Sequence, residues 1–393
     1  MRTCAAAFLG VVLVRGIQAA EDGVGRDTPP QFFQHFAQYA PYRPARQYEE
    51  VPKGCKVSQI HILQRHGARF PTFGATIEFG VTLNKLAAFR QKRRKRKKDS
   101  RRPFFRLRFQ SSTAIEDDGY MLSDRWEWLD KYSYDLGVDD LVPYGVRDAP
   151  NVESAQHWSQ AFAERSNISL PSVLVISESP GSKNPLHNYC PDHKLNLTAP
   201  EIWLQHVAGP IASRLDTLCK EIGLASTDVI NMAHLCAFES LAHDIVSPFC
   251  HLFSHEELQA MEYYDDLGKY YGYSYGDQLA VAQGVGYVNE LLARLTGDLS
   301  FVRKDKTQVN QTLDNDPVAR STDIHFPGSF SHDNQILSIV TLLGLYNDAP
   351  LSPLKPDATR SFKVSKIVPF SGRLVVERVD CTSITNKVTS PVR

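Results

Sequence analysis

The stretch KVSQIHILQRHGARFPT, Lys56–Thr72, joins an apolar alternating run to a short basic loop. The apolar residues Val57, Ile60 and Ile62 indicate a buried strand over residues 56–63. A loop that follows such a strand lies where α/β sheets place their binding crevices. The stretch therefore predicts an α/β fold with a binding site in the loop after this strand.

This loop places His66 between two arginines, Arg65 and Arg69. Guanidinium groups offer planar pairs of donors that suit phosphate oxygens, and their charge lowers the pKa of a neighbouring imidazole. An unprotonated imidazole beside a bound phosphate can act as the nucleophile of phosphoryl transfer. Gly67 would let the backbone approach the anion. The alternative is a solvated basic cluster with an incidental histidine.

A second motif lies in DIHFPGSFSHDNQILSIVTLLGLY, residues 323–346. The pattern predicts a strand, a loop with His332 and Asp333, and an amphipathic helix. A nucleophilic histidine needs an acid that protonates the departing alcohol, and a carboxylic acid can do so at low pH. Asp333 can instead cap the helix, with His332 incidental, and the two roles are compatible.

The first twenty residues, MRTCAAAFLGVVLVRGIQAA, have an early arginine, an apolar run and small residues before Glu21. They predict a secretory signal peptide that is cleaved near Ala19 or Ala20. No later run of about 18 uncharged apolar residues occurs, so we expect a secreted, extracellular protein without a membrane span.

Six cysteines follow the predicted signal peptide, and an even number in an oxidising compartment indicates disulfides. Fifteen connectivities are possible from the sequence alone. No two cysteines form a CxxC pair, which disfavours a zinc site. Asn167, Asn196 and Asn310 lie in sequons, which predicts a glycoprotein.

Other segments have simpler patterns. Residues 29–44 are rich in proline and aromatics and predict an extended arm packed on the surface, and residues 172–179, SVLVISES, predict a second buried strand. Helical spacing occurs over 76–89 and through most of 199–300, and residues 366–379 predict one or two closing strands.

Lysine and arginine balance aspartate and glutamate over the whole chain, 44 against 44, yet residues 90–108 hold twelve basic residues and one acid. The remainder is therefore acidic. A nucleic-acid surface would be out of place in a secreted chain. Runs of like charge seldom fold, so we expect a disordered insertion over 91–123.

The motifs RHGARFPT and SHDN resemble the two hallmarks of the histidine acid phosphatase family, and in particular its secreted fungal phytase branch. Blocks such as YDLGVDDLVPYG, GKYYGYSYGDQLAVAQGVGYVNELLARLT and VPFSGRLVVERVDC resemble phytase segments in the same order. The resemblance implies a mixed-sheet α/β core with a second, mostly helical domain inserted into it. After the signal peptide, residues 21–393 would form one unit, with the core at about 50–80, 145–182 and 320–393 and the helical part at about 183–319.

The resemblance also implies residue roles. His66 would be the nucleophile that forms a phosphohistidine, and Asp333 would be the proton donor. Substrate would be bound by Arg65, Arg69, Arg147, His332, Asn334 and Lys269. Arg147 is assigned by the flanking Val-Arg alone, because the helical segment that precedes it in the family is deleted here. Disulfides Cys236–Cys250 and Cys55–Cys381 are implied, whereas the pairing of Cys190 and Cys219 stays open.

These features predict a secreted acid phosphomonoesterase that hydrolyses phytate without a metal or cofactor. We expect a monomer whose partner is a small phosphorylated substrate, with no nucleic acid and no membrane. One alternative is a broad-specificity acid phosphatase, and another is a member that is catalytically impaired by the deletion before Arg147. A phosphoglycerate-mutase-like transferase shares an RHG loop but does not fit the signal peptide and cysteines.

Overall fold

The strand predicted at 56–63 forms as β2, Cys55–Arg65, in a sheet with the order β1-β4-β2-β3. β4, Arg373–Cys381, runs antiparallel to β2, and β3, Gly328–Ser331, runs parallel to it. β1, Val11–Arg15, pairs antiparallel with the other side of β4. The sheet is therefore mixed, as predicted. The structure is a computed structural model that describes residues 11–15, 31–45, 47–99, 122, 126–138, 149–178, 181–187, 190, 192–217, 222–307, 309 and 326–382.

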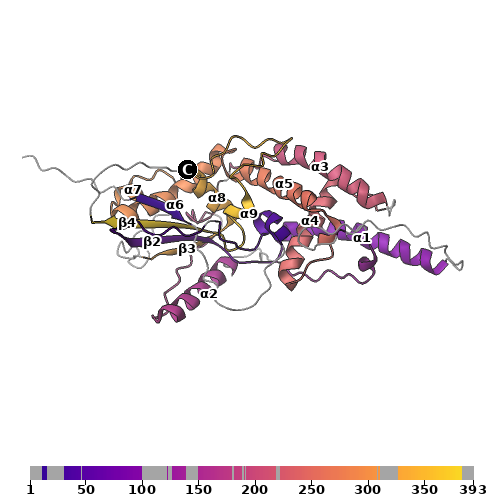
Figure 1. Cartoon of the computed structure of the whole chain (residues 1–393), viewed down its shortest axis with the longest axis horizontal. Coiled ribbons are helices and arrows are strands. Elements are labelled where there is room, and N and C mark those ends of the chain that lie inside the picture. Colours follow the sequence, from indigo (N-terminus) through magenta and orange to yellow (C-terminus); the bar gives the residue numbers. More distant parts are fainter. Residues whose placement is uncertain are drawn as a thin grey trace, which may run out of the picture.

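Helices make up most of the remaining described chain. In Figure 1, α6 and α8 lie along one side of the sheet, α2 lies on the other side, and α1, α3 and α4 extend to the opposite end of the molecule. This helix-rich fold with a small mixed sheet confirms the predicted fold class. The helices are α1 (Phe73–Asp99), α2 (Ala149–Ser166), α3 (Thr198–Thr217), α4 (Ser226–His243), α5 (His255–Tyr273), α6 (Gln278–Thr296), α7 (Ser300–Arg303), α8 (Asp333–Leu342) and α9 (Val364–Ile367), with short 3-10 turns η1 (Gln31–His35), η2 (Ala37–Tyr39), η3 (Glu127–Asp130) and η4 (Cys250–Leu252).

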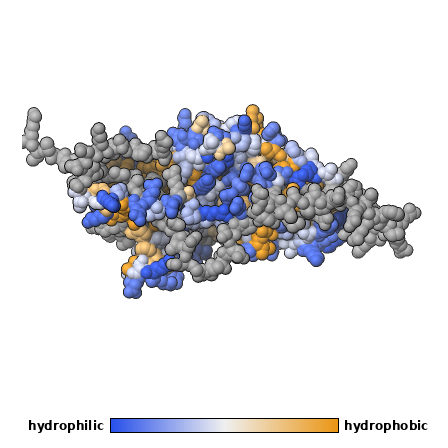
Figure 2. Space-filling view, viewed as in Figure 1, coloured by the Kyte–Doolittle hydropathy of each residue, from blue (hydrophilic) through white to orange (hydrophobic). Residues whose placement is uncertain are grey.

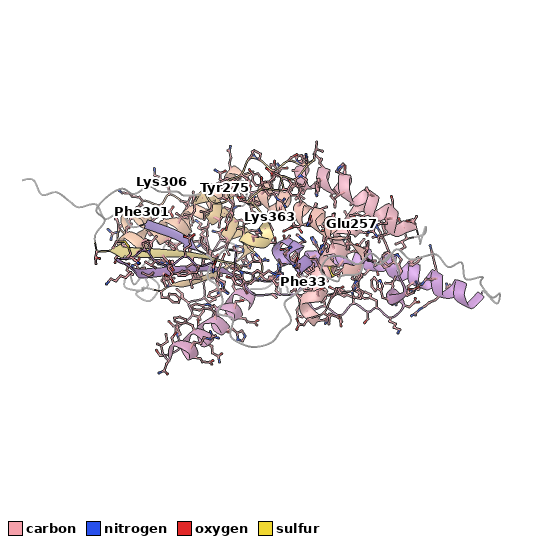
Figure 3. The ribbon with its side chains drawn as sticks, in the orientation of Figure 1. Phe33, Glu257, Tyr275, Phe301, Lys306 and Lys363 are labelled. Atoms are coloured by element: carbon pink, nitrogen blue, oxygen red, sulfur yellow. A yellow bond between two sulfur atoms is a disulfide. The ribbon has the colours of Figure 1, made fainter. Side chains whose placement is uncertain are left out.

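Two apolar clusters hold these elements together. One contains side chains of η1, α1, α3 and α4, and the other joins β2 and β4 to α5, α6 and α8. The arm predicted at 29–44 does pack, with Phe32 and Phe33 buried in the first cluster, but it is not extended there: most of residues 31–39 form η1 and η2. Figure 3 labels Phe33 of η1. Burial of these apolar side chains stabilises the packing of the segment.

The second strand predicted, at 172–179, is also wrong for its described residues. Residues 171–178 have no regular structure, and Leu174 and Val175 are 45% and 46% exposed. A short apolar run indicates that a segment can form a strand, but a strand also needs a neighbouring strand with which its backbone can form hydrogen bonds. Here the segment pairs with no described strand, so its apolar pattern is left at the surface.

The disordered insertion predicted at 91–123 is wrong for residues 91–99, because α1 continues through the basic run to Asp99. Contacts with Asp130 of η3 help to hold the basic run in a helix. It pairs with Arg93 Nη2 at 2.6 Å, and its backbone carbonyl accepts from Arg94 Nη2 at 2.6 Å. Lysine and arginine are good helix formers and are favoured near a helix C-terminus. Residues 101–121 lie outside the described residues.

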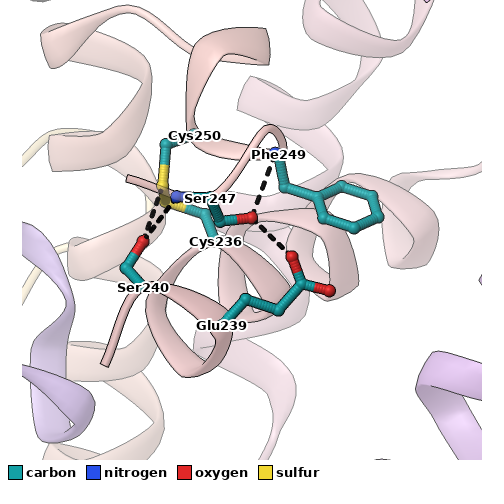
Figure 4. The surroundings of a disulfide bond; sticks show 6 residues. All are labelled: Cys236, Glu239, Ser240, Ser247, Phe249 and Cys250. Atoms are coloured by element: carbon teal, nitrogen blue, oxygen red, sulfur yellow. Dashed lines mark hydrogen bonds between the residues drawn. A yellow bond between two sulfur atoms is a disulfide. The ribbon is translucent and has the colours of Figure 1, made fainter. Parts of the chain in front are cut away.

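Two disulfides implied by the family resemblance are present. Cys55–Cys381 closes the end of the β2–β4 ladder across a sequence separation of 326, and Cys236–Cys250 joins α4 to η4. In Figure 4 the second bond is surrounded by hydrogen bonds, including Ser247 N to Ser240 Oγ at 3.0 Å. Among the described cysteines, Cys190 stands outside a disulfide, and Cys219 lies beyond the described residues.

The N-terminal strand β1 falls inside the segment predicted to be a signal peptide, whose cleavage stays a prediction. Removal of residues 1–20 would leave the outer edge of β4 without this partner. Within the described chain, no helix combines the length and apolar character that a bilayer crossing requires. The face shown in Figure 2 is mainly hydrophilic, with apolar side chains in separate islands.

Candidate active site

Parallel pairing of β2 and β3 brings the two predicted motifs together. Arg65 lies opposite Ser331 in the ladder, so the chain leaves both strands at the same level. The next residues are His66 and His332, whose ring centroids are 5.4 Å apart. The backbone N–H of His66 also donates to the Ser331 carbonyl at 3.1 Å. The structure therefore brings both motifs together at the ends of β2 and β3.

The imidazole of His66 is buried. Burial lowers its pKa well below the ordinary value, and the charges of Arg65, His332 and Arg69 lower it further. The direction agrees with the sequence expectation, but burial is the larger cause. Nδ1 donates to the Gly67 carbonyl at 2.8 Å, since a carbonyl can only accept. This tautomer leaves the lone pair on Nε2, the atom that a nucleophilic role requires.

Contacts with buried residues fix the guanidinium of Arg65. Its Nη1 donates to the carbonyls of Val368, at 2.7 Å, and Gln38, and the guanidinium lies 4.7 Å from the Phe370 ring centroid. Nη2 faces Asp333 Oδ2 at 3.4 Å, and the buried Nε has no hydrogen-bond partner among the described residues. A guanidinium fixed in this way retains donor capacity for an anion.

Asp333 is the anionic centre of the site, at the first turn of α8. Lys269 of α5 donates from Nζ to Asp333 Oδ2 at 2.8 Å and to Asn334 Oδ1 at 2.6 Å. Burial by itself raises the pKa of Asp333, but Lys269 and Arg65 outweigh it and hold the pKa well below its usual range. The free site therefore contains an ionised carboxylate between two cations.

His332 has a set of neighbours that the sequence did not indicate. Its Nε2 lies 3.0 Å from Glu178 Oε2 and 3.1 Å from Asn151 Nδ2, and the ring of His187 is 5.7 Å away between centroids. Glu178 is the last but one residue of the segment predicted as a strand, and His187 follows in the next loop. The strand-end rule that selected His332 could have selected Glu178 as well. Asn151, inside α2, gave no comparable signal.

Six of the eight predicted site residues meet at this place: Arg65, His66, Lys269, His332, Asp333 and Asn334. Arg69 lies in the same loop and donates from Nη1 to the Phe70 carbonyl at 3.1 Å, while its charge acts on His66. Arg147 lies outside the described residues, so its role stays a prediction.

The charge pattern limits the chemistry that this site can host. A buried imidazole lone pair, a carboxylate and a set of fixed cations at strand ends suit a phosphate monoester, whose negative charge the cations balance. Fold and site together define the class: an enzyme of the histidine phosphatase type that hydrolyses phosphoric monoesters.

Comparison with known proteins gives the family. The histidine phosphatase superfamily (branch 2) matches residues 151–393, which include His332 and Asp333. The chain is 30% identical to a protein named Phytase A from Arthroderma benhamiae, over 97% of this chain and 87% of the relative. It is 29% identical to Phytase A of Aspergillus awamori, over 95% and 86%. The chain belongs to the histidine phosphatase superfamily, branch 2.

A solved structure has a similar fold. The phytase from D. castellii superposes with a TM-score of 0.59, at 16% sequence identity, over 91% of this chain and 79% of that one. The QRHGARFPT loop precedes the matched residues 151–393, and it is the match to the whole-length relatives that extends over it.

Proposed function

We propose that this protein is a phytase, a phosphomonoesterase that removes phosphate from myo-inositol hexakisphosphate through a phosphohistidine at His66. The observation that carries the proposal is the buried His66 imidazole, whose pKa is lowered and whose Nδ1 donates to the Gly67 carbonyl, which leaves Nε2 as the nucleophile. The substrate is inferred from the relatives named Phytase A.

In the first step, His66 Nε2 attacks phosphorus and the bond to the ester oxygen breaks. Arg65 and Lys269 would balance the charge on the phosphoryl oxygens, and Asp333 would give its proton to the leaving alcohol oxygen. In the second step, water attacks the phosphohistidine, Asp333 takes the proton of that water, and inorganic phosphate leaves with His66 restored.

The proton on Asp333 has to arrive with the substrate. In the free site Lys269 and Arg65 keep this carboxylate ionised. A bound phosphate places negative charge beside it and competes for the same two cations, and both effects raise the pKa of a carboxyl group. At acid pH, a substrate that binds together with a proton therefore leaves Asp333 protonated and able to act as the general acid. This accounts for an enzyme that works in acidic medium.

Secretion and a monomeric state belong to the same proposal. Two disulfides suit an oxidising, extracellular compartment.

The positions of the cations also suit phytate, which carries several phosphate groups close together. Arg65 lies at the end of β2 and Lys269 lies on α5, so the cations reach the site from different elements.

The test is covalent trapping. The full chain is mixed with phosphorus-labelled phytate near pH 5, quenched in base, and assayed for the base-stable, acid-labile label of a phosphohistidine. We expect label on the wild type and none on His66→Ala. His157→Ala removes an exposed histidine of α2 and is the matched control. A variant without His66 that still carries the label would overturn the nucleophile assignment.

Substrate preference is measured with the same proteins. The ratio of kcat/KM on phytate to that on p-nitrophenyl phosphate separates a phytase from a broad-specificity acid phosphatase. A ratio well above one supports the proposal, and a ratio below one favours the broader enzyme. Absence of turnover on both substrates would instead support an impaired member of the family.

A further inference from the structure

We propose that Glu178, His187 and His332 form an inhibitory binding site for a divalent transition-metal ion, with Zn²⁺ as the best fit. One ligand atom from each residue lies within 4.8 Å of the other two. The three side chains are half-buried, with 21%, 29% and 26% of their surface exposed, so an ion could enter from solvent. The inhibitory part of this inference depends on the proposed function, whereas the binding part does not.

Two of the three distances between ligand atoms are close to those of a zinc site, and the third, between the two histidines, is at most 4.8 Å. Zinc bonds of about 2.0–2.1 Å in a tetrahedron place two ligand atoms about 3.3 Å apart. Glu178 Oε2 lies 3.0 Å from His332 Nε2 and 3.6 Å from His187 Nε2, one slightly below this value and one slightly above it. Two histidines and one glutamate are also a common donor set for zinc with one open position. Small rotations of the two rings would complete the geometry.

The hydrogen bonds at His332 favour an ion for a second reason. Nε2 of His332 faces the Nδ2 donor of Asn151 at 3.1 Å and the acceptor oxygens of Glu178 at 3.0 and 3.1 Å. One ring nitrogen cannot accept from the first and donate to the second at the same time. A cation on Nε2 would satisfy both the lone pair and the carboxylate. Asn151 Nδ2, 3.5 Å from Glu178 Oε1, would then orient the carboxylate.

Such an ion would slow phosphate hydrolysis. His332 lies beside His66 and is a proposed phosphate ligand. Once Nε2 of His332 is bonded to a metal, it can no longer donate to a phosphoryl oxygen. His187 contributes only to the metal in this scheme, so its replacement separates the two roles of the cluster.

The experiment measures binding first. The full chain is treated with a chelator, dialysed, and titrated with Co²⁺ at about pH 6.5, where half of free imidazoles are deprotonated. We expect one equivalent to produce the visible absorption of tetrahedral Co²⁺, and Zn²⁺ to displace it. His187→Ala and Glu178→Gln should each weaken binding at least 10-fold, on the order of the loss that even an outer partner causes. His157→Ala is the control that keeps an intact cluster.

Inhibition is then measured on p-nitrophenyl phosphate, which chelates metals weakly, unlike phytate. Zn²⁺ should inhibit the wild type and His157→Ala, while His187→Ala keeps its metal-free activity and loses the inhibition. A wild type without the Co²⁺ absorption, or binding that His187→Ala and Glu178→Gln leave unchanged, would overturn the site. A chain that binds Co²⁺ through His187 but hydrolyses nothing would support the site and overturn the proposed function.

Discussion

Replacement of Asp333 by asparagine removes both the titratable proton of this side chain and its negative charge, and the two losses have different expected effects. Asparagine keeps the shape and can still accept from Lys269 Nζ, which lies 2.8 Å from Asp333 Oδ2 in the wild type. A positioned general acid contributes about 10²–10⁴-fold in rate. We expect kcat on phytate to fall by this factor, which is about 3–5.5 kcal/mol of transition-state stabilisation.

Phosphate binding should become tighter in Asp333→Asn. In the wild type the carboxylate neutralises Lys269 at 2.8 Å and competes for Arg65 at 3.4 Å. A unit charge about 6 Å from a bound phosphate is worth about 3 kcal/mol at an effective dielectric constant of 20. Its removal should therefore tighten product inhibition by inorganic phosphate, with about 100-fold as the upper limit.

The assay compares Asp333→Asn with the wild type on phytate and on p-nitrophenyl phosphate, together with the inhibition constant of phosphate. Nitrophenolate leaves without protonation, so the loss of kcat should be much smaller on the second substrate. Asp298→Asn, at an exposed site before α7, is the matched control. Equal losses on both substrates would exclude Asp333 as the proton donor, and weaker phosphate inhibition would refute the charge estimate.

Three further results are expected. Lys269→Met removes a cation that lowers the pKa of Asp333, so the alkaline limb of the kcat profile should move to higher pH. His61 is buried and its pKa is lowered to about 4, mainly by burial, so stability should fall between about pH 6.5 and 4 by up to about 3 kcal/mol; urea titrations of His61→Gln should show a flatter dependence. Loss of Cys55–Cys381, with its separation of 326, should lower Tm more than loss of Cys236–Cys250, with a separation of 14, since loop entropy predicts about 6 against about 3 kcal/mol.

The sequence predicts the structure best where the pattern of neighbouring residues alone determines the element that forms. The apolar period of 56–63 and the strand–loop–helix pattern of 323–346 predicted β2, β3 and α8, and both motifs were expected at strand ends. Because parallel strands end on the same side of a sheet, the meeting of His66 and His332 follows from that assignment.

Errors arose where a distant partner decides the outcome. SVLVISES has the composition of a strand but lies beside no described strand, whereas the basic run of α1 becomes helical next to Asp130. The cluster around His332 was missed for the same reason. Glu178, His187 and Asn151 come from three segments whose proximity no local pattern records.

The order of strands in the sheet also has a consequence for biosynthesis. β2 has β4 as its long antiparallel partner, and Cys55 pairs with Cys381 at the far end of that ladder. Synthesis proceeds from the N-terminus at about 5–20 residues per second. β2 therefore leaves the ribosome tens of seconds before β4 exists. In the interval its apolar face has no sheet to join, so the nascent chain is expected to need chaperone protection. Helices α1, α3 and α4 can pack meanwhile, and the catalytic end of the molecule is completed last.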